Sequence, residues 1–188
     1  MKWCLGLALA WLNLVPAMAR EQPNYPPTPA QVSVCFVPAN VCDRGIAAAI
    51  AQSTRTIRVQ AYGFSSPPIL QALATAKKRG VEVAILLDKS NARGKYSGAT
   101  FMANAGVPVA IDVKPAIAHN NIIIIDDHMV IGGSFNYTSS AEARNAENVS
   151  YIDSPAIAGW YTKNWLSRQA VSVPYQPGIM LDGKAGRE

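Results

Sequence analysis

Short apolar runs and longer helix-forming segments alternate along the chain. Runs rich in β-branched residues and bounded by Gly, Pro, Asn or Asp predict strands over residues 32–37, 56–64, 81–88, 107–112, 122–125 and 147–152. The segments between them predict helices over residues 44–53, 65–80, 99–106 and 155–168. Gly80 and Gly106 are typical of the position just past a helix end, which supports two of these boundaries.

The alternation of strands and helices indicates an α/β fold. The strands are almost continuously apolar, which indicates a sheet that helices cover on both faces. We therefore predict a mixed, largely parallel β-sheet flanked by helices on both faces, in a single domain over residues 32–173. Residues 20–31 are rich in proline and polar residues and predict a linker, and residues 174–188 predict a loose C-terminal tail.

The first 19 residues differ from the rest of the chain. Lys2 supplies a positive start, residues 3–15 form an apolar run, and Ala17-Met18-Ala19 has the A-x-A pattern of a cleavage site. This order is typical of a secretory signal peptide over residues 1–19, with an uncleaved membrane anchor as the alternative. We therefore expect a periplasmic or secreted protein without a stable membrane span after cleavage.

The chain carries a formal net charge of +5, which falls by one when Lys2 is removed with the signal peptide. A positive excess suits an anionic partner such as nucleic acid or phospholipid head groups. The loop from Lys89 to Lys95 is a candidate phosphate contact, with an ordinary solvated loop as the alternative.

Two cysteines remain after removal of Cys4, which lies in the predicted signal peptide. In an oxidising compartment Cys35 and Cys42 either form a disulfide or stay as a buried thiol and a loop thiol, and the sequence leaves both open. No further Cys or His lies close to this pair, so a metal site is not expected there.

Polar residues of chemical interest surround the apolar strand over residues 122–125. His119 precedes this strand and, by the period of two, shares a strand face with Asn121. Beyond the strand, Gly132-Gly133 permits close backbone approach, and neutral donors follow at Ser134 and Asn136. Such donors suit a phosphate or another oxyanion.

Two acidic residues and a second histidine complete the cluster. Glu147 lies in a predicted strand and could accept a hydrogen bond from an imidazole, which would fix its tautomer and raise its basicity. Asp126 has the opposite strand parity from His119, so an ordering role is favoured for it over direct chemistry. His128 is predicted at a hairpin tip. Each residue alone fits an ordinary polar sheet edge, whereas the cluster indicates a site.

The spacing of these residues resembles the phospholipase D superfamily signature HxKxxxxDxxxxxxGSxN. His119 matches its histidine, Asp126 its aspartate, and Gly133-Ser134-Phe135-Asn136 its GSxN. The segment AENVSYI resembles the NAEN segment of the small exported bacterial endonuclease branch, in which the glutamate pairs with the catalytic histidine. Glu147 takes that position. The resemblance extends over about residues 32–165, nearly the whole predicted domain.

One position departs from the signature, because Asn121 stands where the family has a lysine. The resemblance implies that this lysine holds the phosphate and neutralises charge in the transition state. Asn donates hydrogen bonds but carries no charge and reaches less far. Loss of one positioned donor in a water-shielded site raises the barrier by about 2.7–4 kcal/mol, roughly a hundredfold or more in rate. The departure therefore bears on turnover more than on fold or ligand class.

The resemblance implies a metal-independent phosphodiesterase that needs no cofactor. One imidazole attacks phosphorus to form a phosphohistidine, a second protonates the leaving alcohol, and water then attacks. Because the chain has one motif, the resemblance implies a symmetric homodimer in which the two copies of His119 meet. The implied catalytic residues are His119 as nucleophile or general acid, Glu147 as its orienter and Asp126 in an ordering role; the implied phosphate-binding residues are Asn121, Ser134 and Asn136.

Three functions fit this pattern. An endonuclease acting on DNA or RNA is favoured by the short single-motif chain and the export signal. A lipid phosphodiesterase of the phospholipase D kind is the alternative, although no wide lipid-binding insertion is visible in the sequence. The third is a catalytically weakened phosphate- or nucleic-acid-binding homologue, which Asn121 supports.

Overall fold

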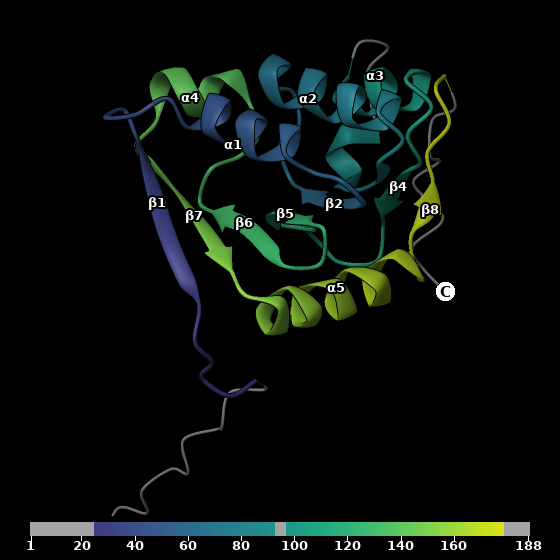
Figure 1. Ribbon diagram of the computed structural model, residues 1–188. Coiled ribbons are helices and arrows are strands. Elements are labelled where there is room, and N and C mark those ends of the chain that lie inside the picture. Colours follow the sequence, from purple (N-terminus) through teal and green to yellow (C-terminus); the bar gives the residue numbers. More distant parts are fainter. Residues whose placement is uncertain (1–24, 93–96, 179–188) are drawn as a thin grey trace, which may run out of the picture.

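The computed structural model describes residues 25–92 and 97–178, so the predicted signal peptide lies outside the described residues. The described strands form an open eight-stranded sheet in the order β1-β7-β6-β5-β2-β3-β4-β8 (Figure 1). Their bounds are β1 Gln31–Val37, β2 Thr56–Ala61, β3 Glu82–Asp88, β4 Val109–Asp112, β5 Asn121–Ile125, β6 Met129–Gly133, β7 Glu147–Asp153 and β8 Val173–Pro174.

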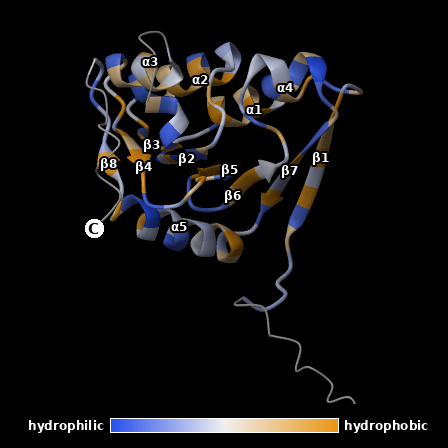
Figure 2. Cartoon of the chain, turned by 180° about the vertical axis from the view of Figure 1, so that it is seen from behind, coloured by the Kyte–Doolittle hydropathy of each residue, from blue (hydrophilic) through white to orange (hydrophobic). Residues whose placement is uncertain are grey.

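Helices cover both faces of the sheet, as the apolar strands predict. Their bounds are α1 Cys42–Ala51, α2 Pro67–Lys78, α3 Gly98–Asn104, α4 Ser139–Arg144 and α5 Pro155–Gln169, with a short 3-10 turn, η1, at Lys89–Ala92. In Figure 1, α1 to α4 lie over one face and α5 lies over the other. Figure 2 shows the apolar segments of β4, β5 and β6 between the two helix layers. The α/β sandwich is therefore confirmed, and α4 is a helix that the sequence pattern did not predict.

The sheet is mixed, but the prediction that it is largely parallel is wrong. Only β2–β3 and β3–β4 pair in parallel among the described strands, where α2 and α3 carry the chain back across the sheet. The pairs β1–β7, β7–β6, β6–β5, β5–β2 and β4–β8 are antiparallel. The reason is local: a tight turn joins β5 to β6, with Ile125 opposite Met129, and such a hairpin permits only antiparallel pairing.

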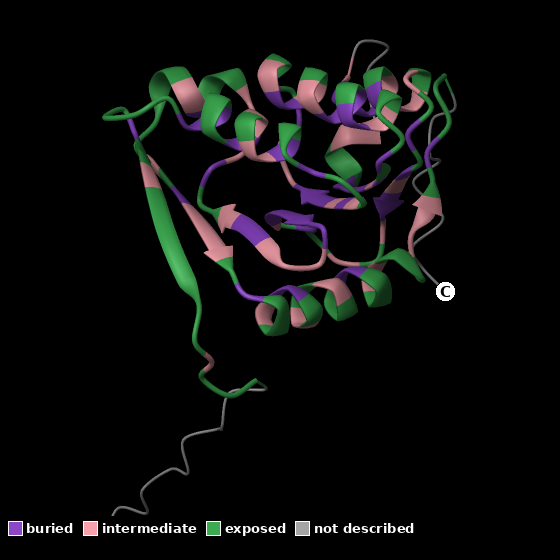
Figure 3. Cartoon of the chain, viewed as in Figure 1, coloured by how far each residue is buried: buried purple, intermediate pink, exposed green. Residues whose placement is uncertain are grey.

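The four consecutive isoleucines of β5 divide between two apolar cores. Ile123 and Ile125 belong to the larger core, which also contains buried residues of α1, α2 and α3. Ile122 and Ile124 belong to the smaller core beneath α5, together with Trp165. Because side chains alternate between the two faces of a strand, a strand covered on both faces is apolar at every position. In Figure 3 the central strands are buried, whereas β1 at the sheet edge is exposed along most of its length.

The end of the described chain packs against the sheet, so the prediction of a loose tail from residue 174 is wrong for its first residues. β8 pairs with β4, and the N–H of Tyr175 donates to the carbonyl of Val109 at 2.8 Å. The Tyr175 ring is buried, and its hydroxyl lies 2.7 Å from the Thr100 hydroxyl. Residues 179–188 lie outside the described part of the chain.

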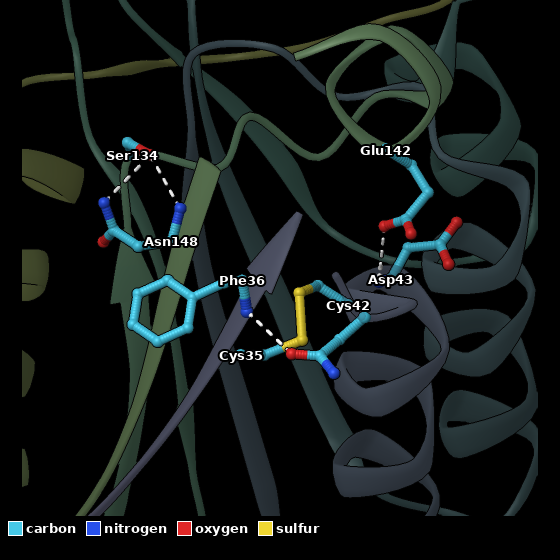
Figure 4. Close-up of a disulfide and its surroundings, with 8 residues drawn as sticks. Cys35, Phe36, Cys42, Asp43, Ser134, Glu142 and Asn148 are labelled. Atoms are coloured by element: carbon cyan, nitrogen blue, oxygen red, sulfur yellow. Dashed lines mark hydrogen bonds between the residues drawn. A yellow bond between two sulfur atoms is a disulfide. The ribbon is translucent and has the colours of Figure 1, made fainter. Parts of the chain in front are cut away.

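A disulfide joins Cys35 of β1 to Cys42 at the start of α1, with the two Cα atoms 5.8 Å apart (Figure 4). The sequence left this pairing open because the two cysteines become neighbours only when α1 packs beside the end of β1. The bond holds an edge strand to the helix layer, and β1 in turn pairs with β7, which begins at Glu147.

Candidate active site

His119 lies at the end of the connection between β4 and β5, two residues before β5 begins. Its side chain is exposed, and its ring meets the ring of Tyr62 edge-on, with the ring centroids 4.8 Å apart and the planes at 72°. Tyr62 directly follows β2, the neighbour of β5 in the sheet. The histidine therefore stands at the sheet end where β2 and β3 finish and β5 begins.

Asn121 is the first residue of β5 and pairs with Ala61 of β2. Its side chain is buried, and its Oδ1 atom accepts a hydrogen bond from the backbone N–H of Tyr62 at 3.3 Å. A backbone N–H can only donate, so this contact fixes which end of the amide is the oxygen. The Nδ2 group is consequently the end of Asn121 that can donate to a bound anion.

His119 and Asn121 line one pocket of about 370 Å³ on the face of the sheet that carries α5. Apolar side chains and small residues make up most of its wall, and no lysine or arginine is among its lining residues. The lining residues are His119, Asn120, Asn121, Ile122, Val130, Gly132, Gly133, Ser150, Ile152 and Tyr161. Because side chains alternate along β5, the Asn121 side chain projects to the face of Ile123 and Ile125, whereas Ile122 lines this pocket on the α5 face. The prediction that His119 and Asn121 face the same space therefore stays a prediction.

Lys89 does not replace the missing lysine in this structure. Its Nζ atom donates to the carbonyl of Pro115 at 3.2 Å on an exposed part of the surface. The rest of the predicted basic loop falls partly on residues 93–96, which lie outside the described residues. Within the described chain, Lys89 is thus bound to Pro115, and no lysine or arginine is among the residues that line the pocket beside His119.

Ser134 follows β6 and makes three hydrogen bonds within the protein. Its hydroxyl donates to the carboxylate of Glu147, and its oxygen accepts from the backbone N–H and the side-chain Nδ2 of Asn148 at 3.1 and 3.2 Å (Figure 4 shows the Asn148 contacts). A hydroxyl has one proton and two lone pairs, so this hydroxyl is fully engaged. Contact between Ser134 and a phosphate would require exchange of at least one of these partners.

Glu147, the first residue of β7, accepts hydrogen bonds from Ser134 and from the Nδ2 group of Asn145, the latter at 2.7 Å. Among the residues that the structure describes, His119 is not one of its partners. The carboxylate is therefore tied to the GSxN segment in this chain. Its pairing with an imidazole, which the sequence predicts, stays a prediction.

Gly133 allows β6 to approach β7 closely at this point. A Cβ atom at Gly133 would lie 2.3 Å from the carbonyl oxygen of Asn148, a distance that no side chain tolerates. The expectation that Gly132-Gly133 permits close backbone approach is confirmed at Gly133. The close approach brings Ser134 and Asn148 within hydrogen-bond distance.

Asn136 presents a buried Oδ1 atom that has no hydrogen-bond partner among the described residues. This oxygen faces Gly63, where an added Cβ atom would lie 3.4 Å from it and 2.9 Å from Thr138. An unpaired buried polar atom is unfavourable and is often found where a ligand completes the site. The Nδ2 end of Asn136 remains as the donor of this amide.

Asp126 lies at the opposite end of β5 from His119. It therefore does not belong with the other predicted catalytic residues, His119 and Glu147. Its carboxylate accepts hydrogen bonds from the backbone N–H groups of Thr54, Arg55 and Thr56 at 2.8–2.9 Å, and from the Thr54 hydroxyl. Burial raises the pKa of Asp126, but these donors outweigh burial and lower the pKa to about 2. These hydrogen bonds hold the backbone before β2 against the end of β5, which is the ordering role that strand parity favours for Asp126.

His128 lies in the β5–β6 turn, as predicted, and its Nδ1 atom is 3.1 Å from a carboxylate oxygen of Asp153. It is therefore at the far end of β5 from His119.

The sequence analysis did not identify two residues that contact the site. Tyr62 contacts His119, and Asn148 contacts Ser134. Their signal is weak, because a tyrosine after a strand and an asparagine within one are ordinary until the sheet order is known.

The fold and the His-x-Asn, Asp and GSxN segments define a protein of the phospholipase D superfamily. Residues 46–168 match the family described as "Cardiolipin synthase, PLD-like domain", and the chain belongs to this phospholipase D-like family. At that level the chain is a phosphodiesterase of the superfamily, with Asn121 in place of the signature lysine.

Individual relatives agree with this assignment. A phospholipase D of Rickettsia bellii is 47% identical over 141 residues, which cover 75% of this chain and 70% of that protein. The crystal structure of Nuc, a phospholipase D family member from Salmonella typhimurium, has a TM-score of 0.74 and 34% identity, and covers 79% of this chain and 99% of Nuc. NucT from Helicobacter pylori shares the fold, with a TM-score of 0.72 and 20% identity over 78% of this chain and 100% of that chain.

Proposed function

We propose that this chain is a metal-independent phosphodiesterase that cleaves DNA or RNA through a phosphohistidine at His119. The observation that supports the proposal is the exposed His119 at the sheet end where β5 begins, with Tyr62 in contact with both the His119 ring and the side chain of Asn121. An exposed imidazole can reach phosphorus, and the Nδ2 ends of Asn121 and Asn136 are neutral donors for the phosphate oxygens.

The reaction proceeds in two displacements. A neutral His119 imidazole nitrogen bonds to phosphorus as the bond to the leaving oxygen breaks, and a second imidazolium gives that oxygen its proton. Water then attacks phosphorus, the same second imidazole takes its proton, and the bond between nitrogen and phosphorus breaks. Each cycle consumes one water and returns both imidazoles to their starting states.

The second imidazole must come from a second copy of the chain. The sequence contains two histidines, and His128 is held in the β5–β6 turn away from His119. A symmetric homodimer brings His119 of each copy to a common axis. In this proposal Glu147 exchanges one of its partners, Ser134 or Asn145, to orient an imidazole.

An exposed apolar strip supports association of two copies. Val32, Val34 and Phe36 of β1 are 60%, 55% and 51% exposed, although they are large apolar side chains on an ordered strand. They pair with Ile152, Ser150 and Asn148 of β7. Ile152 and Ser150 also line part of the pocket beside His119. Exposed apolar residues that continue from an incomplete site suit a protein interface.

Nucleic acid is the first proposed substrate, and phospholipid is the second. The match over nearly the full length of Nuc, together with the AENVSYI segment, favours the short branch for which an endonuclease is expected. The apolar wall formed by Ile122, Val130 and Ile152, and the similarity to a protein named phospholipase D, favour the lipid alternative. The proposed location for either activity is the periplasm or the exterior.

The test compares the protein lacking residues 1–19 with its His119→Ala variant, on plasmid DNA, on single-stranded RNA and on phosphatidylcholine vesicles, each with and without EDTA. We expect cleavage of nucleic acid that EDTA leaves unchanged and His119→Ala abolishes. Cleavage of the vesicles alone would replace the nuclease with the lipid phosphodiesterase. Activity lost with EDTA would reject the metal-free mechanism, and binding without cleavage would leave a phosphate-binding homologue.

A further inference from the structure

The backbone leading into His119 is anchored by a buried carboxylate on the neighbouring part of the sheet. Asp88, the last residue of β3, is 3% exposed. Its Oδ2 atom accepts a hydrogen bond from the N–H of Ala118 at 2.7 Å, and its Oδ1 atom accepts one from the N–H of Ser90 at 2.8 Å. One side chain therefore ties the end of β3 to the residue that directly precedes the histidine.

This carboxylate is ionised at neutral pH. Burial raises the pKa of Asp88, but the N–H groups of Ser90 and Ala118 and the nearby charge of Lys89 outweigh burial and hold the pKa below its usual value. Hydrogen bonds to an ionised acceptor are about twice as strong as those between neutral groups. The link between Asp88 and Ala118 is thus a strong restraint on the connection that ends at His119.

A second restraint acts on the ring of His119 through Tyr62. Asn91 of η1 donates its Nδ2 group to the Tyr62 carbonyl at 2.6 Å and to the Asp88 carbonyl at 3.2 Å. The held tyrosine packs its ring against His119 and donates its N–H to Asn121. Asn91 therefore fixes a residue that contacts both the His119 ring and the amide of Asn121.

These restraints matter because the His119 ring has little else to hold it. Within residues 25–92 and 97–178 the ring makes no hydrogen bond, and its side chain is exposed. A nucleophile must be held close to its attack geometry, and a misplacement of about 1 Å can lower the rate about a hundredfold. The glutamate expected to orient the imidazole is bound instead to Ser134 and Asn145.

We propose that Asp88, Asn91 and Tyr62 form a positioning cluster for His119, in which Asp88 fixes the backbone before the imidazole and Asn91 holds Tyr62 against its ring. None of the three touches the reacting phosphate in this role. The catalytic consequence rests on the proposed function of His119, whereas the restraint on the ring does not.

A matched control lies one strand away. Asp112 of β4 is paired with Asp88 in the sheet and is also buried. Its carboxylate binds the guanidinium of Arg168 on α5 at 2.7 and 2.8 Å, and its contact with the connection to His119 is a 3.4 Å hydrogen bond from the Lys114 N–H. Loss of charge at Asp112 should therefore lower stability and leave the histidine in place.

The experiment measures the nuclear Overhauser effect between the Tyr62 and His119 rings, together with kcat and KM on bis(p-nitrophenyl) phosphate. We expect Asp88→Asn and Asn91→Ala to weaken the ring contact and to lower kcat about 10- to 100-fold with little change in KM. The two N–H groups meet different oxygens of Asp88, so an asparagine at this position would present its NH2 group to one of them. Asp112→Asn should lower the melting temperature while keeping the ring contact and the activity.

Two results would overturn the proposal. The first is an unchanged ring contact and kcat in Asp88→Asn and Asn91→Ala. The second is a loss of ring contact and kcat in Asp112→Asn as large as in Asp88→Asn, which would make the effect one of general stability. A wild-type protein with no activity would reject the proposed role of His119, and the ring contact would still decide whether the cluster positions it.

Discussion

The amide oxygen of Asn121 accepts a hydrogen bond from the backbone N–H of Tyr62, the residue whose ring packs against His119. This contact orients the amide so that its nitrogen is the end that can donate to a phosphate. The substituted signature position therefore still offers a donor, but it offers no charge, and no lysine or arginine lines the pocket of the described structure.

Restoring the signature lysine should raise turnover. We expect Asn121→Lys to increase kcat on bis(p-nitrophenyl) phosphate about a hundredfold, because a positioned cation stabilises charge that develops on the phosphate oxygens. Loss of the Tyr62 hydrogen bond should lower the free energy of unfolding by about 1 kcal/mol. Asn120→Lys places the same charge one residue away and is the control. Equal gains in both variants would show a general charge effect and not a restored contact.

Asp126 should support stability and not chemistry. Its folded pKa of about 2 lies below the ordinary value of 3.8, so its contribution is fully present above pH 4 to 5 and is lost as the pH falls toward 2. We expect Asp126→Asn to lower the free energy of unfolding by about 2 kcal/mol at pH 7, with a smaller difference from wild type at pH 3. Urea denaturation of both proteins at pH 7 and pH 3 measures the difference in their free energies of unfolding.

The control for that variant is Asp127→Asn in the same turn. Asp127 is more exposed and pairs with Arg58, and such pairs contribute up to about 1 kcal/mol. The kcat of Asp126→Asn, measured well below its melting temperature, should stay within about twofold of wild type. A loss of turnover without a loss of stability would return Asp126 to the catalytic set.

The disulfide between Cys35 and Cys42 should stabilise the folded chain by about 2–3 kcal/mol, because it closes a short loop in the unfolded state. We expect thermal unfolding of the wild type to shift to lower temperature in dithiothreitol. The double variant Cys35→Ser with Cys42→Ser should melt at that lower temperature with or without the reductant. A melting temperature of the wild type that does not respond to reduction would show that the bond contributes nothing.

The apolar strip of β1 should be needed for dimer formation. We expect Val34→Glu to convert the protein to a monomer in size-exclusion chromatography with light scattering, and to abolish phosphodiester cleavage. Val171→Glu, at an exposed apolar residue outside the strip, should remain a dimer with wild-type activity. A wild-type protein that is monomeric and active would contradict both the role of the strip in dimer formation and the requirement for a second His119.

The order of most elements follows from local pattern, and the candidate site residues are identified from their spacing along the chain. Apolar runs and turn residues locate β2, β3, β5 and α5, because strand and helix periodicities act over a few neighbouring residues. The direction of the pairings does not follow in this way. The prediction of a largely parallel sheet failed because direction depends on which strands become neighbours, and the hairpin of β5 and β6 inserts antiparallel pairs beside β2.

The sequence by itself determined the family, since His119, Gly133-Ser134 and Asn136 stand at signature spacing, and it identified Asn121 as the departure. Only the tertiary structure decided what each residue touches. In the folded chain, Asp126 accepts hydrogen bonds from the Thr54–Thr56 backbone, and Glu147 accepts one from Ser134. Asp88 accepts one from the backbone N–H of Ala118, directly before His119. These contacts join segments far apart in the chain, and their partners depend on strand order and register, which no local pattern specifies.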